Sequence, residues 1–133
     1  MINIDLIMDM LDCNQANEVQ EYGRKLAKEV KCINVFLQPN HPEHNKNVWE
    51  NCAKVLAERS DRELRPYLHE LFQWLLDMNW PGARCIFGRL TQYRDKEWFD
   101  FMLAICINEA KALGEEIWLH NLYEVRDRAG IFC

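Results

Sequence analysis

The chain has 133 residues, of which 49% are hydrophobic, and its 16 Lys and Arg residues against 21 Asp and Glu residues give a net charge of −5 at pH 7. This length fits one compact domain, and the acidic balance opposes nonspecific attraction to the phosphates of nucleic acid. Five glycines and four prolines are too few for the turns of a sandwich of short strands, so we expect one all-helical domain over residues 1–133.

Apolar residues recur at spacings of three and four along most of the chain, which predicts amphipathic helices. In chain order, helices are expected over about residues 4–11, 15–30, 46–58, 61–76, 81–93, 97–113 and 115–128, with a brief apolar segment over 31–37 and a loop over 39–45. The side chains expected to cap these helices are those of Asn14 or Asn17, Ser60 or Asp61, and Asp95, and Gly114 is expected to end one.

The stretch from Leu71 to Ala83 is the turn around which the second half of the chain is organised. A helix must end before Pro81, because proline lacks the N–H that an interior helical position donates, whereas proline fits the first turn of a following helix. We therefore expect a tight helical hairpin in which Asp77 and Asn79 cap the second helix. Trp80, at the corner, is expected to be an apolar plug between the two helices.

This turn also carries a family resemblance. The segment 74–80 with its following Pro81, within residues 61–90, resembles a family of small bacterial proteins known only as a domain of unknown function, family 5071. The resemblance becomes looser out to about Val125, and it implies a fold of HEAT-type helical repeats. It brings no established catalytic residues.

An internal repeat is visible when the second helices of successive helical pairs are aligned. One position is shared by Val19, Trp49, Ala83 and Trp118, a second by Gly23, Ala53, Phe87 and Leu122, and a third by Leu26, Leu56, Leu90 and Val125. Stacked pairs bury faces that a lone pair leaves exposed. We therefore expect an all-α, HEAT-like α-solenoid of about four helical hairpins, irregular at the second; the alternative is an irregular helical bundle.

The second helices of a solenoid usually line its concave face, so residues beside the shared apolar positions are candidates for binding a partner. They carry both signs of charge, which suits a protein or peptide better than a nucleic-acid duplex. The candidate partner-binding residues are Glu21, Arg24, Glu50, Lys54, Arg84, His120 and Tyr123.

The sequence contains no complete catalytic, cofactor or metal site. His41 and His44 are close in sequence, but Pro42 between them opposes the helix that would turn both toward one metal ion. His69 and His120 are expected at the edge of the core. Glycine-rich phosphate loops and the common hydrolase motifs are absent, so we predict that the protein is not an enzyme and uses no cofactor.

The cysteines and the aromatic residues are expected in the interior. The six cysteines form no C-x-x-C pair, and the N-terminus lacks the pattern of a secretory signal, which predicts reduced, mostly buried thiols in a cytoplasmic protein. No apolar run is long enough for a membrane helix. The run from Trp98 to Ile105 predicts a central buried helix, and Trp49, Trp74 and Trp118 are expected in the core.

Three functions from different classes fit these observations. We favour a non-catalytic protein-binding module of unknown partner, in a specific version a bacterial immunity protein, because an acidic surface steers association with a basic toxin. The second is a nucleic-acid-binding or DNA-repair-like HEAT protein, which the acidic charge disfavours. The third is a self-assembling structural element, a homo-oligomer in which residues 1–2 and 131–133 pack against another copy.

Overall fold

The computed structural model describes residues 3–40 and 45–129, and within these ranges it is all-helical, with no strand. Its α-helices are α1 (Ile4–Met10), α2 (Asn17–Ala27), α3 (Trp49–Ala57), α4 (Asp61–Leu64), α5 (Leu68–Gln73), α6 (Ala83–Thr91), α7 (Lys96–Leu113) and α8 (Glu116–Arg128). Its short 3-10 helices are η1 (Ile33–Phe36), η2 (Gln38–Asn40), η3 (Lys46–Val48), η4 (Arg65–Tyr67) and η5 (Trp74–Leu76). The expectations for both chain ends and for His41 and His44 lie outside the described residues.

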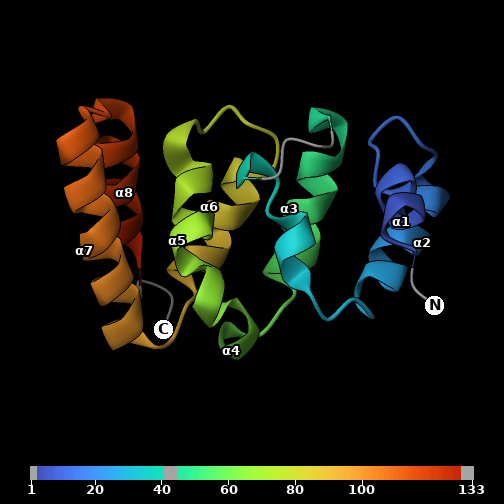
Figure 1. The fold of residues 1–133 in the computed structure, drawn as a ribbon, viewed down its shortest axis with the longest axis horizontal. Coiled ribbons are helices and arrows are strands. Elements are labelled where there is room, and N and C mark those ends of the chain that lie inside the picture. Colours follow the sequence, from blue (N-terminus) through green and yellow to red (C-terminus); the bar gives the residue numbers. More distant parts are fainter. Residues whose placement is uncertain (1–2, 41–44, 130–133) are drawn as a thin grey trace.

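The helices follow one another as pairs in a single row (Figure 1). In the first pair, α1 packs on α2. In the third pair, α5 continues into η5, and η5 packs on α6. In the last pair, α7 packs on α8. The second members also contact one another in order, α2 with α3, α3 with α6, and α6 with α8. In the second pair the short helix η1 takes the place of a full first helix, because the segment before Pro39 is too short for a longer helix. Helix η1 packs on α3.

The predicted caps of α4 and α7 are confirmed. The Ser60 hydroxyl accepts the N–H of Glu63, and the Glu63 carboxylate accepts the N–H of Ser60, which is a reciprocal capping box. The Asp95 carboxylate accepts the N–H of Trp98 at 3.1 Å at the start of α7. Gly114 ends the same helix with a φ of 69°. In each case a local sequence signal determines the helix end.

Two predictions for the first half of the chain are wrong. The helix expected after residue 60 is divided into α4, η4 and α5 around Pro66, because proline cannot donate the N–H that a continuous helix needs. The residue before α2 is Ala16, and no side chain caps the helix there, so neither Asn14 nor Asn17 acts as its cap.

The turn between η5 and α6 differs from the prediction in its details. Helix α6 begins at Ala83 rather than at Pro81, and the residue before it, Gly82, has a φ of 85°. The Asp77 carboxylate accepts the N–H of Asn79 at 2.8 Å, within the turn itself. The expected capping of α6 by Asp77 and Asn79 is therefore wrong, and α6 starts from a glycine without a side-chain cap.

Trp80 is half-buried, and it contacts the neighbouring pair as well as its own hairpin. Its ring meets that of Trp49 on α3 edge-on, with centroids 5.5 Å apart. Trp49 in turn meets Trp74 edge-on at 6.3 Å, and the Trp74 indole N–H donates to the carbonyl of Pro81 at 3.0 Å. These tryptophans join the turn to α3. Trp80, predicted to lie between the two helices of its own hairpin, therefore also packs against the preceding helical pair.

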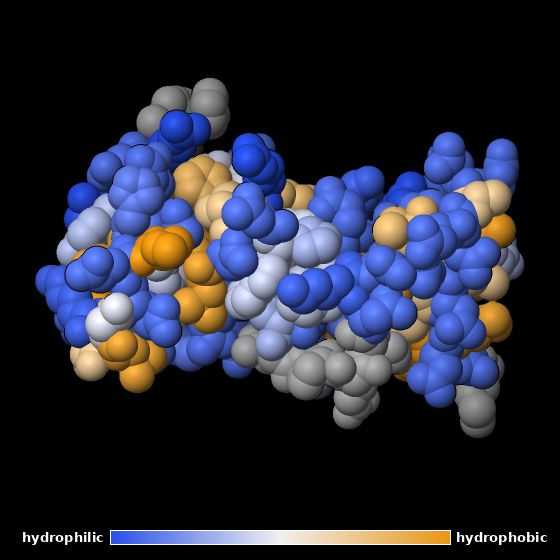
Figure 2. Space-filling view, turned by 90° about the horizontal axis from the view of Figure 1, so that it is seen from above, coloured by the Kyte–Doolittle hydropathy of each residue, from blue (hydrophilic) through white to orange (hydrophobic). Residues whose placement is uncertain are grey.

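Helix α7 lies at one end of the row, so the prediction of a central buried helix there is wrong (Figure 1). Phe99 is buried but Phe101 is 56% exposed, whereas Trp49, Trp74 and Trp118 are buried as predicted. Among the described residues, the exposed large hydrophobic side chains all belong to the two end pairs: Leu6, Tyr22, Phe101, Leu113 and Ile117. In Figure 2 hydrophobic groups likewise gather toward the ends of a mainly hydrophilic face.

The cysteines of the described residues are all free thiols. Cys52 and Cys106 are buried as predicted, Cys85 is half-buried, and Cys13 and Cys32 are exposed, contrary to the prediction. Burial raises the pKa of the Cys106 thiol to about 12. In the two described ranges, no helix combines the length and the apolar character needed to cross a membrane.

Candidate functional site

The predicted partner-binding residues come from the second members of the pairs, α2, α3, α6 and α8. These helices contact one another in order and run in the same direction (Figure 1), so equivalent positions lie on neighbouring helices. Exposed side chains among the predicted residues are those of Glu21, Glu50, Lys54, Arg84 and His120, and half-buried ones are those of Arg24 and Tyr123.

A shallow hollow of about 200 Å³ lies between α3 and the start of α6. It is lined by Glu50 of α3, by Arg84 of α6, and by the turn residues Met78, Asn79, Trp80, Pro81 and Gly82. A carboxylate and a guanidinium from neighbouring helices therefore border the indole of Trp80.

A second hollow, of about 390 Å³, continues from the first across α6 to α8. Met78 and Arg84 line both hollows. The second hollow adds Phe87 of α6 and, from α8, His120, Asn121, Glu124 and Arg128. We call the residues that line the two hollows the Arg84 surface. The structure thus brings together the predicted residues Glu50, Arg84 and His120.

The charged side chains of α8 on this surface interact only weakly with one another. The Glu124 carboxylate lies 3.7 Å from Nε2 of His120 and 3.7 Å from Nε of Arg128. Exposed pairs of this kind contribute about 0–1 kcal/mol to stability. These charges are therefore available for interaction with another molecule.

Arg24 is engaged inside the protein. Its Nη1 donates to Oδ1 of Asn51, a buried residue of α3. The Asn51 amide in turn donates to the carbonyl of Leu11 at 2.7 Å and to the side chain of Gln20 at 2.9 Å. Arg24 therefore helps to hold the first helical pair against α3, although its predicted role in binding stays a prediction.

The remaining predicted residues do not line the Arg84 surface. Glu21 and Lys54 are exposed on α2 and α3. The guanidinium of Arg126 lies over the ring of Tyr123, 4.7 Å from its centroid. Of the predicted partner-binding residues, only those on α3, α6 and α8 that line the two hollows lie together: Glu50, Arg84 and His120.

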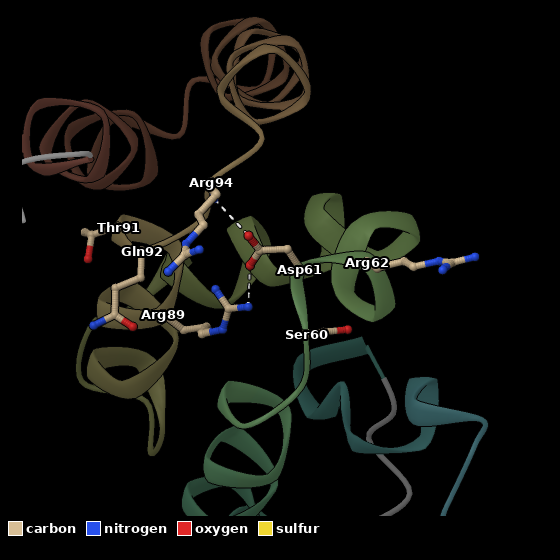
Figure 3. Close-up of a pocket in the computed structure, with 7 residues that line it drawn as sticks. All are labelled: Ser60, Asp61, Arg62, Arg89, Thr91, Gln92 and Arg94. Carbon is tan, nitrogen blue, oxygen red and sulfur yellow. Dashed lines mark hydrogen bonds and ion pairs between the residues drawn. The ribbon is translucent and has the colours of Figure 1, made fainter. Parts of the chain in front are cut away.

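A larger hollow, of about 670 Å³, lies at the opposite end of α6, where α4 begins. Its lining residues are Ser60, Asp61, Arg62, Arg89, Thr91, Gln92 and Arg94 (Figure 3). We call it the Asp61 hollow.

Asp61 joins the start of α4 to the end of α6. Its Oδ1 accepts a hydrogen bond from Nη2 of Arg89, and its Oδ2 accepts the main-chain N–H of Arg94 at 2.9 Å. The Tyr93 hydroxyl donates to the main-chain carbonyl of Asp61 at 3.3 Å. Desolvation, followed by the negative charge of Asp61, raises the pKa of Tyr93 above its usual value. Asp61 thus does not cap α4 but joins its first turn to the end of α6.

The Asp61 hollow is not predicted by the sequence patterns described above. From the sequence, Asp61 is expected only as a possible helix cap, and Arg89 and Arg94 have no expected role. The hollow forms because segments about thirty residues apart meet, and no short motif marks such a meeting. The occurrence of Arg84, Arg89 and Arg94 within eleven residues of an acidic chain is a sequence signal that could indicate this hollow.

Of the two histidines predicted at the edge of the core, His69 lies there, whereas the prediction is wrong for His120. His69 is half-buried on α5, and its Nε2 lies 2.8 Å from Oε1 of Glu109 on α7. His120 is exposed on α8. Over residues 3–40 and 45–129, no group of three or more His, Cys, Asp or Glu side chains is arranged to hold a metal ion.

Comparison with known proteins identifies one family. A family profile described as "Domain of unknown function (DUF5071)" matches residues 42–122. A search of curated proteins and a search of solved structures each found no significant match. The matched range includes α3 to α7 and the first half of α8, whereas α1 and α2 precede it.

Proposed function

The chain belongs to the DUF5071 family of domains of unknown function, and we propose that it is a non-catalytic protein-binding module whose partner docks on the Arg84 surface. The observation that carries the proposal is the pair of adjoining hollows that share Met78 and Arg84 and extend from α3 to α8. Most of this surface lies within the range matched by the family, including Glu50, Arg84 and His120.

The composition of the Arg84 surface suits a protein partner. Arginine, methionine and aromatic residues are enriched in protein interfaces, and here Arg84 lies with Met78, Trp80 and Phe87. Glutamates on α3 and α8 border the same hollows. We expect a partner segment that inserts an apolar side chain beside Met78 and carries an acidic group toward Arg84.

We further propose that the helical pairs form a HEAT-like solenoid. Support comes from the unbroken series of contacts among α2, α3, α6 and α8, since each pair of a solenoid contacts its neighbours in the row. The irregular helical bundle is the alternative architecture. An experimental structure showing second helices stacked with a constant rotation between pairs would decide for the solenoid.

A specific version of this function is that of a bacterial immunity protein acting in the cytoplasm. The net charge of −5 supports it, because a negatively charged protein is steered toward a basic toxin. In this version the partner is encoded by a neighbouring gene, and the protein blocks it by covering it.

The test is co-expression of the full chain with the product of a neighbouring toxin-like gene, followed by affinity capture. Arg84→Glu should abolish capture and protection, because it reverses the charge at the centre of the surface. Lys111→Glu makes the same charge change at an exposed position of α7 and should leave both intact. Equal capture by the two variants, or no partner for either, would contradict the proposal.

A second candidate function, self-assembly, has its own observation. Among the described residues, the exposed large hydrophobic side chains belong to the first and last pairs, for example Leu6 and Ile117. Opposite ends of a row can associate head to tail. If the protein self-assembles, sedimentation should give an average mass that increases with protein concentration. The double variant Phe101→Ser with Ile117→Ser should reduce that increase. A constant monomer mass would refute self-assembly.

The nucleic-acid-binding alternative has less support. Tracking a phosphate backbone requires several basic residues along one groove, whereas Glu50 and Glu124 lie beside the arginines of the Arg84 surface. Titration with labelled DNA at two salt concentrations would revive this alternative if the affinity falls steeply with salt.

A further inference from the structure

The Asp61 hollow contains more positive charge than its own carboxylate can neutralise. Its lining holds three arginines, Arg62, Arg89 and Arg94, and one acid, Asp61. Of the arginines, Arg89 pairs with Asp61, whereas Arg62 and Arg94 form no ion pair with any described residue. This local excess of positive charge occurs in a chain of net charge −5.

Both carboxylate oxygens of Asp61 are already engaged. Oδ1 accepts from the Arg89 guanidinium, and Oδ2 accepts from the main chain of Arg94. Because the second donor is a main-chain N–H, the Arg94 guanidinium is not used in that contact. Asp61 therefore fixes the position of the Arg94 backbone and leaves the side-chain charge of Arg94 available.

Arg89 is held rigidly with unused donors. Its side chain is only 12% exposed, and its Nη2 donates both to Asp61 and to the carbonyl of Arg59 at 3.0 Å. Its Nη1 and Nε donate to no described residue. An arginine fixed by two acceptors on one nitrogen presents its remaining N–H groups in a defined direction, which favours binding of an oxyanion.

The guanidinium groups of Arg89 and Arg94 turn toward the same space in Figure 3, with the Gln92 amide on the same side. The Arg62 side chain extends in the opposite direction, away from that space. The hydroxyls of Ser60 and Thr91 are engaged with Glu63 and with the Gly88 carbonyl. The donors available for a ligand are therefore those of Arg89, Arg94 and Gln92.

We propose that the Asp61 hollow binds a phosphate group, either free or carried by a small phosphorylated molecule. Two guanidinium groups match the charge of a phosphate monoester, about −1.5 to −2 at pH 7, and its several acceptor oxygens. A volume of about 670 Å³ also leaves room for the rest of a small molecule. The hollow and the Arg84 surface lie at opposite ends of α6, so this proposal does not depend on the protein-binding function.

The test is calorimetric titration of the full chain with inorganic phosphate at pH 7.5, with sodium chloride of equal ionic strength as the blank. Arg94→Gln is the informative variant, because the main-chain N–H that Asp61 accepts is kept. It should weaken phosphate binding about tenfold or more. Arg62→Gln is the matched control, since it removes the same charge from the rim and should retain wild-type affinity within about twofold.

Further probes distinguish the source of the phosphate group. Tighter binding of glycerol phosphate than of inorganic phosphate would indicate a phosphorylated small molecule, and the reverse order would indicate free phosphate; both support the site. Three outcomes would overturn the proposal: no heat above the chloride blank, equal weakening by Arg94→Gln and Arg62→Gln, or binding of succinate as tight as that of phosphate. Melting temperatures in chloride would confirm that both variants are folded.

Discussion

A Cβ atom added to Gly82 would lie 2.6 Å from the Cβ of Ala53 and 2.9 Å from the carbonyl oxygen of Trp49. The turn between η5 and α6 therefore lies directly against α3. Gly82 also has a φ of 85°, which residues with a side chain rarely adopt. We expect Gly82→Ala to lower the free energy of unfolding by about 2–4 kcal/mol, measured by urea denaturation.

The control for this prediction is Gly88→Ala in α6, the helix that Gly82 precedes. Apart from its chain neighbours and the backbone of its own helix, a Cβ at Gly88 would have no described atom within 4 Å. Alanine is favoured over glycine inside a helix by about 0.5–1 kcal/mol. Gly88→Ala should therefore stabilise the protein slightly. Similar effects of the two substitutions would show that the close approach to Ala53 does not matter.

A second prediction concerns Asn121, a buried residue of α8 whose side-chain amide donates to the carbonyl of Leu75 at 2.7 Å. Asn121→Ala leaves that carbonyl without its donor, which should cost about 1–3 kcal/mol of unfolding free energy. Asn108→Ala removes an amide from an exposed position of α7 and should change stability by less than about 0.5 kcal/mol. Chemical denaturation of both variants checks the difference, and equal stabilities would refute a role for the buried bond.

A third prediction concerns the pH dependence of the α4 cap. Hydrogen bonds from Arg59 and from the N–H of Ser60 lower the pKa of Glu63 below its usual value. Because the folded pKa is depressed, the stabilisation by the charged carboxylate is present above the unfolded pKa of about 4.3 and is lost as pH falls through the folded pKa. Glu63→Gln should thus be less stable than the wild type at pH 7, and the difference should shrink as pH falls through the folded pKa of Glu63.

The size of this effect is small, because the Glu63 side chain is 46% exposed. We expect at most about 1 kcal/mol at pH 7. Thermal unfolding of the two proteins at pH 7 and pH 3 measures it. A difference that persists unchanged at pH 3 would mean that the charge of Glu63 is not responsible.

A fourth prediction concerns thiol reactivity. The thiolate is the reactive form of cysteine. Burial raises the pKa of the Cys106 thiol to about 12, and it also raises the pKa of the Cys52 thiol. Treatment of the native protein with iodoacetamide at pH 8, followed by peptide mass mapping, should label Cys13 and Cys32 rapidly and leave Cys52 and Cys106 unlabelled until denaturant is added. Rapid native labelling of Cys106 would contradict the buried environment.

The helix ends that could be predicted are those determined by neighbouring residues. Asp95 and Gly114 mark the ends of α7 through local hydrogen bonding and backbone preference. The break at Pro66 is not predicted, because Leu64 and Leu68 on either side of it keep the spacing of an amphipathic helix, and both are buried in the structure. The apolar pattern therefore continues across η4, although the α-helix does not. The positive φ of Gly82 depends on the approach to α3, which local sequence does not reveal.

The candidate site could be predicted only in part. The alignment of the repeated helices predicts Glu50, Arg84 and His120 as candidates, and the structure brings them together because equivalent positions of neighbouring helices lie close to one another. Met78 and Phe87 join them through the packing of the turn and of α6 on α8, which depends on contacts distant in sequence. The Asp61 hollow likewise requires α4 to meet the end of α6, and no periodicity predicts that contact.

The buried amide of Asn51 contacts both helices of the first pair, through the carbonyl of Leu11 after α1 and through Gln20 and Arg24 on α2. Partial opening of either helix would leave this amide unpaired, so the two should detach from α3 as one cooperative unit. In native-state hydrogen exchange, the slowly exchanging amides of α1 and α2 should then share one opening free energy. That value should differ from the opening free energy of α3 and α6, which Trp49, Trp74 and Trp80 join.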